Sequence, residues 1–184
     1  QRRLDGVRLS VAAFTNLSRD HLDYHRTIDA YRQAKARLFS DLLPADGIAV
    51  LNADTPETAA LASAFEGRVI SYGQHGDELK LQMVEPLHNG MRIALNALGH
   101  QSLIDLPLAG TFQVYNVLCA AGIALACGET SERVIGCLQN LEGAPGRLEF
   151  AGSTMGGSVY IDYAHTPDAL ENVLTAMRPH TNGR

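Results

Sequence analysis

The sequence predicts an α/β fold: a mostly parallel sheet with flanking helices and a small antiparallel β insertion. Up to residue 72, short apolar runs typical of buried strands alternate with helix-like segments, as the crossover connections of a parallel sheet require. From about residue 77 to residue 108, strand-like segments follow one another with only turns between them, which is typical of an antiparallel meander. A Gly-Pro segment near residue 145 then indicates a domain boundary.

The first domain is predicted to cover residues 1–144, with the insertion at about 77–108. Its first elements are a strand at 7–16, a helix capped by Thr27 and ending near Leu43, a strand at 47–51, a helix capped by Thr55 with Pro56 first and ending near Phe65, and a strand at 68–72. The later ones are strands at 79–84, 91–95 and 101–106, a well-buried helix at 111–127 ended by Gly128, and a helix beginning at Ser131.

The second unit, residues 145–184, is predicted to be a hinge and the first β-β-α part of a C-terminal domain. Its elements are a strand near 147–150, a turn at 156–157, a buried strand at 158–163, and a helix that Pro167 opens and that runs to about Met177.

Composition excludes several function classes. The net charge of −5 provides no basic patch, so we expect no nucleic-acid partner. No apolar run approaches the roughly 18 residues that span a bilayer, and no signal peptide opens the chain, so we expect no membrane partner and a cytoplasmic location. Cys119, Cys127 and Cys137 form no CxxC pair and lie in Ala- and Leu-rich helical segments, which predicts buried free thiols.

The ends of the chain and its lysines suggest a piece of a longer protein. The chain begins at Gln1 without a methionine and ends just past a helical segment. Lysine occurs only at Lys35 and Lys80, and neither follows a glycine, so these residues contain no GxxxxGK[ST] phosphate-binding loop. If the parent protein transfers phosphate, we expect its phosphate-binding lysine to lie outside this chain.

Lys35 occupies the centre of an apolar helical stripe. At about 100° per residue it shares one arc with Ile28, Tyr31, Leu38 and Phe39. The ordinary interpretation is a buried stem with the ammonium group reaching water. The alternative is an amine kept out of water, which is more often neutral and can capture CO₂ as a carbamate. An anionic carbamate would suit a Mg²⁺ ion that a residue of the preceding turn also binds.

Two turns carry polar residues at the ends of predicted strands, where ligands of open α/β sheets bind. The first turn contains Asp20, His21, Asp23 and His25. Its carboxylate and imidazole groups are suited to binding Mg²⁺ or Mn²⁺. The alternative is an Asx-type turn with exposed histidines. The second turn contains Asp162, Tyr163 and His165 and leads into the start of a helix. Such a position favours the binding of anions and ribose hydroxyls. The alternative is an ordinary helix cap at Thr166 or Asp168.

Five segments, in order, resemble the Mur ligases, which are ATP-dependent amide-forming enzymes of peptidoglycan assembly. They are TNLSRDHLDYH at 15–25, YRQAK ending at Lys35, GTFQVYN at 110–116, PGRLE at 145–149 and DYAHTPDAL at 162–170. The resemblance spans the whole chain and, within the family, is greatest to the ligase that adds the third residue of the stem peptide. It implies that the chain contains most of the central ATPase domain without its P-loop, followed by the start of the Rossmann-like C-terminal domain.

The resemblance also implies roles for individual residues. His21 and a carbamylated Lys35 correspond to catalytic magnesium ligands, and Gln1 and Arg3 correspond to contacts with the UDP-MurNAc-peptide. The residues that correspond to the ATP site are Asn116, Arg147, Asp162, Tyr163 and His165, together with Asn52 and Asp54 near the nucleotide. Gln113 replaces the asparagine that is more usual in its motif.

The implied reaction has two steps, with ATP and Mg²⁺ as cofactors. ATP phosphorylates the γ-carboxylate of D-glutamate in UDP-MurNAc-L-Ala-D-Glu, and the amine of meso-diaminopimelate or L-lysine then displaces phosphate. The family implies a monomer, and we expect the 184 residues alone to be inactive. The alternatives are another Mur ligase or folylpolyglutamate synthetase, or a non-catalytic nucleotide-binding module.

Overall fold

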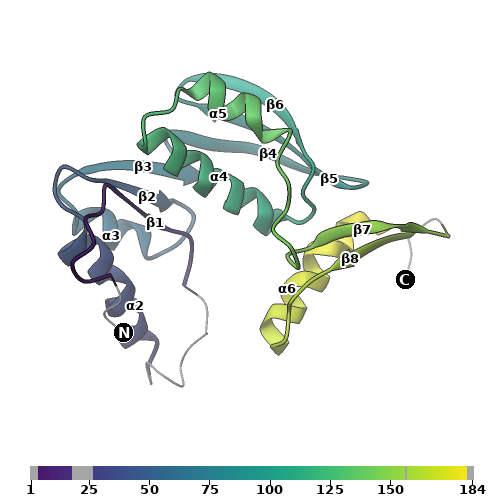
Figure 1. The fold of residues 1–184 in the computed structure, drawn as a ribbon, viewed down its shortest axis with the longest axis horizontal. Helices are drawn as coiled ribbons and strands as arrows, with labels where there is room; N and C mark the ends of the chain where they lie inside the picture. Colours follow the sequence, from purple (N-terminus) through teal and green to yellow (C-terminus); the bar gives the residue numbers. More distant parts are fainter. Residues whose placement is uncertain (1–3, 18–26, 156, 182–184) are drawn as a thin grey trace.

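The computed structural model describes residues 4–17, 27–155 and 157–181. Within them, a six-stranded sheet in the order β1-β2-β3-β4-β5-β6 is accompanied by a separate two-stranded sheet, β7-β8 (Figure 1). The six strands are β1 (Val11–Phe14), β2 (Ile48–Asn52), β3 (Arg68–Gly73), β4 (Leu79–Leu87), β5 (Gly90–Ala97) and β6 (His100–Leu106). The helices beside them are α2 (Ile28–Arg37), α3 (Thr58–Ser63), α4 (Thr111–Ala126) and α5 (Ser131–Leu138).

The predicted α/β fold is confirmed, and the meander is part of the main sheet. Strands β1 to β4 pair in parallel, and β4, β5 and β6 pair antiparallel. Only residues 74–78 separate β3 from β4, and yet Tyr72 pairs with Leu79 in parallel. The chain therefore turns through a full loop after β3, and the antiparallel strands extend the parallel sheet.

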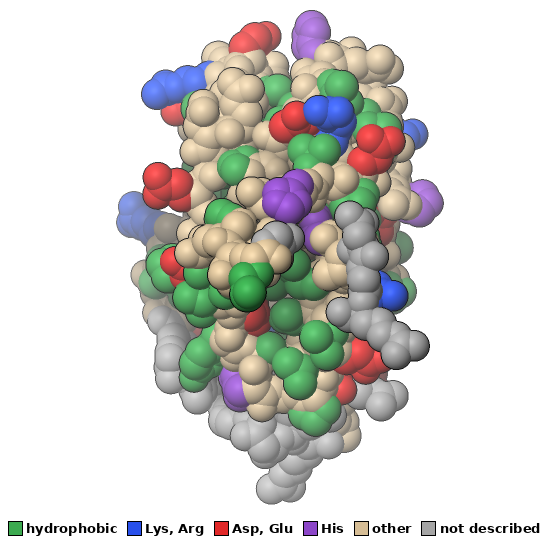
Figure 2. All heavy atoms as spheres, turned by 90° about the vertical axis from the view of Figure 1, so that its right-hand side faces the viewer, with side chains coloured by type: hydrophobic (Ala, Val, Ile, Leu, Met, Phe, Trp, Pro, Cys, Tyr) green, Lys and Arg blue, Asp and Glu red, His purple; other side chains and the backbone are tan. Residues whose placement is uncertain are grey.

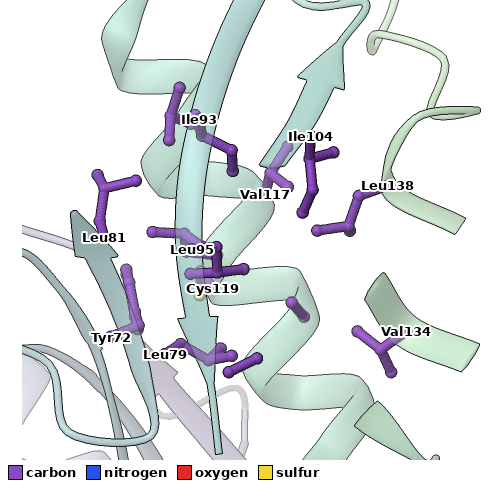
Figure 3. Close-up of a cluster of buried hydrophobic side chains, with 14 of the residues drawn as sticks. Tyr72, Leu79, Leu81, Ile93, Leu95, Ile104, Val117, Cys119, Val134 and Leu138 are labelled. Atoms are coloured by element: carbon purple, nitrogen blue, oxygen red, sulfur yellow. The ribbon is translucent and has the colours of Figure 1, made fainter. Parts of the chain in front are cut away.

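Both faces of the parallel strands are covered, as their continuous apolar runs predict. Val50 of β2 belongs to the cluster beneath α4, whereas its neighbours Ala49 and Leu51 belong to a second cluster with Phe39 and Leu61. The larger cluster continues under α4 and α5 into the meander. Its labelled members in Figure 3 include Tyr72, Leu79, Ile93, Leu95, Val117 and Leu138.

The remaining elements form a small C-terminal unit, which lies apart from the main sheet in Figure 1. Strands β7 (Glu149–Thr154) and β8 (Gly157–Ile161) form a hairpin, and α6 (Pro167–Met177) follows it. The start of α6 is as predicted: Thr166 is the N-cap and accepts a 3.2 Å hydrogen bond from the Ala169 amide, and Pro167 is the first residue. A short 3-10 turn at Arg178–His180 brings the His180 imidazole within 2.7 Å of the Leu87 carbonyl oxygen on β4.

The start of one helix was predicted wrongly. Helix α3 begins at Thr58 with Glu57 as its N-cap, because the Thr55 hydroxyl instead donates to the Asn52 carbonyl oxygen at 3.1 Å. The predicted helix from the Thr27 N-cap to about Leu43 is confirmed, and its last part, Leu38–Leu42, is a π-helical turn.

Burial was also overestimated in places. Strand β8 is largely exposed, and of the three cysteines only Cys119 is buried, since Cys127 and Cys137 lie on exposed positions. No described helix is both long and apolar enough to cross a bilayer.

Candidate functional site

A cavity of about 460 Å³ lies where β1 ends, beside α2 and the π-helical turn. Its lining includes Phe14 and Thr15 from the end of β1 and Lys35 and Leu38 from the helical segment. The carboxyl end of a strand in a parallel sheet is the usual place for a ligand. Lys35 lies at the edge of this cavity, whereas its proposed partner His21 lies outside the described residues, as do Gln1 and Arg3.

The groups around Lys35 favour the positively charged form of its amine. Its Nζ donates a 3.1 Å hydrogen bond to the Asn16 carbonyl oxygen and lies 5.0 Å and 5.7 Å from the ring centroids of Tyr31 and Phe14. The side chain is half-buried, and no residue of α2 is fully buried, so Lys35 is less shielded than the apolar stripe predicted. An anionic carbamate on Nζ would be repelled by the ring faces and would have to turn toward the cavity.

Asn52 ties the ends of β1 and β2 together next to this cavity. Its side chain is only 6% exposed, Nδ2 donates to the Thr15 carbonyl oxygen at 2.9 Å, and Oδ1 accepts from the Asp54 amide at 3.0 Å. The amide therefore fixes the backbone of Thr15, which lines the cavity, and that of Asp54 in the turn after β2.

The Asp54 carboxylate accepts four hydrogen bonds from two other segments. Three come from the loop after β3, from the Gln74 amide at 2.7 Å, the His75 amide at 2.9 Å and His75 Nδ1 at 2.7 Å. The fourth comes from the Tyr115 hydroxyl of α4 at 2.8 Å. Burial alone would raise the pKa of Asp54, but these hydrogen bonds outweigh it, and the net pKa lies below its ordinary value.

A second group of candidate residues meets at the junction between α4 and the C-terminal unit. Gln113, on the first turn of α4, donates from Nε2 to the Arg147 carbonyl oxygen at 2.8 Å. Its Oε1 accepts from Nδ2 of Asn116 at 3.0 Å. The Arg147 guanidinium and the Asn116 side chain are exposed, so both are accessible to a ligand.

Asp162 stabilises the backbone at the same junction. Its carboxylate accepts 2.8 Å hydrogen bonds from the amides of Leu148 and Ala164. Beyond it, the Tyr163 ring is 68% exposed and contacts the His165 ring edge-on at 4.9 Å between centroids. His165 Nδ1 lies 2.9 Å from the Tyr163 carbonyl oxygen and must carry a hydrogen to donate to it, which leaves Nε2 free to accept in the neutral ring.

The structure thus brings most of the predicted residues into two groups linked through Asp54 and α4. The first contains Lys35, Asn52 and Asp54, and the second contains Asn116, Arg147, Asp162, Tyr163 and His165. The link runs from Asp54 to Tyr115, which directly precedes Asn116. Sequence reasoning missed Tyr115 and the bridging role of Gln113, because both contacts join segments far apart in the chain.

No metal centre is complete among the residues that the structure describes. No three His, Cys, Asp or Glu side chains gather there closely enough to hold an ion. On the face drawn in Figure 2, which shows the end of the molecule with the C-terminal unit, Lys and Arg side chains are scattered among hydrophobic, acidic and histidine side chains. The coloured part of this face therefore has no basic patch of the kind that binds nucleic acid.

Comparison with known proteins places these features in one family. The family model described as "Mur ligase middle domain" matches residues 1–124. The UDP-N-acetylmuramoyl-L-alanyl-D-glutamate--2,6-diaminopimelate ligase of Caulobacter vibrioides is 50% identical over 188 aligned residues, which include all of this chain but only 39% of that protein's length.

Two solved structures superimpose closely. MurF from Acinetobacter baumannii gives a TM-score of 0.83 at 26% identity, over 96% of this chain and 39% of MurF. A UDP-N-acetylmuramoyl-L-alanyl-D-glutamate--2,6-diaminopimelate ligase gives 0.81 at 31% identity, over 98% of this chain and 38% of that ligase. Because the family model matches residues 1–124, about two thirds of the chain, the chain belongs to the Mur ligase family.

Proposed function

We propose that this chain is part of an ATP-dependent ligase that joins 2,6-diaminopimelate to UDP-MurNAc-L-Ala-D-Glu. The observation that carries the proposal is the 50% identity, over the whole chain, to the Caulobacter vibrioides ligase named for these two substrates. The chain spans about 39% of that protein's length, so the activity belongs to a longer polypeptide in this proposal.

In the proposed reaction, the γ-carboxylate of D-glutamate attacks the terminal phosphorus of ATP and becomes an acyl phosphate, with ADP released. The amine of diaminopimelate then attacks the acyl carbon, loses a proton and displaces phosphate. Both steps depend on positioning and on neutralising negative charge. Mg²⁺, when bound, would supply part of the positive charge that neutralises it.

The chain's own residues have two tasks in this proposal. Asn116, Arg147, Asp162, Tyr163 and His165 hold ATP at the hinge, with an exposed amide, a guanidinium and an aromatic pair available for base, phosphate and ribose. Lys35, as a carbamate, and His21 would hold Mg²⁺ beside the cavity at the end of β1, where the ion would neutralise charge on the transferred phosphoryl group. Asn52 and Asp54 hold the backbone on which this arrangement rests.

We further propose a domain division and a setting for the reaction. Residues 1–144 belong to the central ATPase domain, and residues 145–184 form the hinge and the start of the C-terminal domain. Gln1 and Arg3 contact the UDP-MurNAc-peptide. The enzyme acts as a monomer in the cytoplasm, where its nucleotide-linked substrate would be made.

The test is phosphate release by the complete ligase that contains this chain. With ATP and UDP-MurNAc-L-Ala-D-Glu, we expect release to require an amino acid, and diaminopimelate to be used at least roughly tenfold more efficiently than L-lysine. Phosphate release with L-lysine but not with diaminopimelate would refute the assignment of diaminopimelate as the substrate. Release that needs neither the muramoyl substrate nor an amino acid would refute the ligase itself.

A further inference from the structure

A buried glutamine connects the hinge to an exposed amide on α4. The Gln113 side chain is 6% exposed, and both ends of its amide are engaged: Nε2 donates to the Arg147 carbonyl oxygen at 2.8 Å, and Oε1 accepts from Asn116 Nδ2 at 3.0 Å. Buried amides are rarely left unpaired, because an unmet donor or acceptor costs free energy. The two hydrogen bonds therefore fix the orientation of this side chain.

The direction of these hydrogen bonds follows from one backbone atom. The Arg147 carbonyl oxygen can only accept, so the NH₂ end of Gln113 must face it. The other end, Oε1, also can only accept, so Asn116 must turn its own NH₂ group toward Gln113. Oδ1 of Asn116 consequently points away from Gln113, and no residue in the described part of the chain donates to it.

We propose that Gln113 is a positioning residue that makes Asn116 select adenine. The inference rests on the proposed function, in which Asn116 lies at the base of ATP. With one Nδ2 hydrogen held by Gln113, Asn116 offers Oδ1 as an acceptor and the second Nδ2 hydrogen as a donor.

This pair of groups matches one base and opposes another. Adenine presents its 6-amino group as a donor and N7 as an acceptor, which complements the free edge of Asn116. Hypoxanthine and guanine carry an oxygen at position 6, so two acceptors would face each other. If Asn116 could rotate its amide, it would present NH₂ to that oxygen and lose the preference.

The first experiment uses the unmodified complete ligase and compares kcat/KM for ATP and ITP, which differ at position 6. We expect ATP to be favoured by roughly tenfold to a hundredfold, as a bidentate amide–adenine pair supplies. Equal use of the two nucleotides would overturn this inference and leave the proposed function intact. Use of neither nucleotide would overturn the proposed function.

The second experiment removes the positioning residue. Gln113→Met keeps the length of the side chain but neither donates to the Arg147 carbonyl oxygen nor orients Asn116. We expect the ATP-to-ITP ratio to fall to within about threefold, mainly through KM, because Asn116 is then free to rotate. Gln139→Met is the matched control at an exposed position, the C-cap of α5, and it should keep the original ratio.

A purely structural role for Gln113 would lower the use of both nucleotides equally. An unchanged ratio in folded Gln113→Met, verified by its thermal unfolding curve, would therefore contradict the proposal. Should this variant fail to fold, equal use of ATP and ITP by the unmodified enzyme would still overturn the proposal, because it excludes a fixed acceptor–donor edge on Asn116.

Discussion

The Tyr115 hydroxyl donates a 2.8 Å hydrogen bond to the Asp54 carboxylate, 61 residues earlier in the chain. It joins α4 to the turn after β2, and the same carboxylate holds the loop after β3 through the amides of Gln74 and His75. Burial and the contact with Asp54 raise the pKa of Tyr115 to about 12, so the hydroxyl stays protonated and donates throughout the neutral range. One carboxylate thus fixes three segments around the candidate site.

The stability of the protein should depend on pH through Asp54. Its folded-state pKa is below the ordinary value of 3.8, so its contribution is fully present above that value and is lost as pH falls through the lower folded-state pKa. At neutral pH, Asp54→Asn should lower the free energy of unfolding by about 1–3 kcal/mol, since it weakens hydrogen bonds to a charged group. Urea unfolding at several pH values measures the difference, which should shrink below about pH 4.

Asp46→Asn is the control for this experiment, because Asp46 is exposed. If the difference in free energy of unfolding between wild type and Asp54→Asn stayed constant down to pH 3, the hydrogen bonds would not be lowering the pKa of the Asp54 carboxylate.

Gly73 should not tolerate a side chain. Its φ is +120°, and a Cβ atom there would lie 2.5 Å from Asp54 Oδ2. Gly73→Ala should lower the free energy of unfolding by about 1–3 kcal/mol beyond the cost of the backbone conformation itself. Gly99→Ala measures that conformational cost alone, because Gly99 has φ +91° and nothing within 4 Å of its Cβ position. Equal losses in the two variants would exclude a steric contribution from Asp54.

Gly122 should be required for α4 to approach the sheet. A Cβ atom at this position would lie 2.7 Å from Val50 Cγ1 on β2. We expect Gly122→Ala to destabilise the protein by about 1–3 kcal/mol, because the helix must move away from β2. Gly136→Ala on α5, with open space around the new methyl group, should instead stabilise it by about 0.5–1 kcal/mol. Thermal unfolding of both variants gives the sign of each effect.

Asp162 should protect the hinge against local opening. Replacing it with alanine leaves the amides of Leu148 and Ala164 without their acceptor. In Asp162→Ala, hydrogen exchange of both amides should accelerate by roughly tenfold or more, as the loss of a hydrogen bond to a charged group predicts. Asp168→Ala, at an exposed position in the first turn of α6, should leave the Leu148 amide unchanged. Unaltered exchange in Asp162→Ala would exclude this role.

Elements with local signals were predicted well from the sequence. Pro167 after Thr166 gave the start of α6, Gly128 with φ +96° follows the end of α4, and strand-like segments separated only by turns marked the meander. In each case the determining interaction lies within a few residues, where capping, turn conformation and hydrophobic periodicity act.

Features that depend on distant segments could not be read from the sequence. The parallel pairing of β3 with β4 requires a loop that Asp54 holds from another segment, and Gln113 acquires its role only through the Arg147 carbonyl oxygen. Likewise, periodicity placed Lys35 on the inner side of its helix, but the degree of burial depends on how α2 packs. Helical spacing alone does not contain that information.

The measurement that tests the account most directly is ligase activity after replacement of Lys35. In the complete enzyme, Lys35→Ala should reduce turnover by roughly a hundredfold or more, as the loss of one preorganised electrostatic group does, and a short carboxylic acid should restore part of it. Lys80→Ala, which removes the other lysine at an exposed position, should leave turnover unchanged. Normal amide formation by Lys35→Ala would contradict the proposal that this side chain organises the reaction.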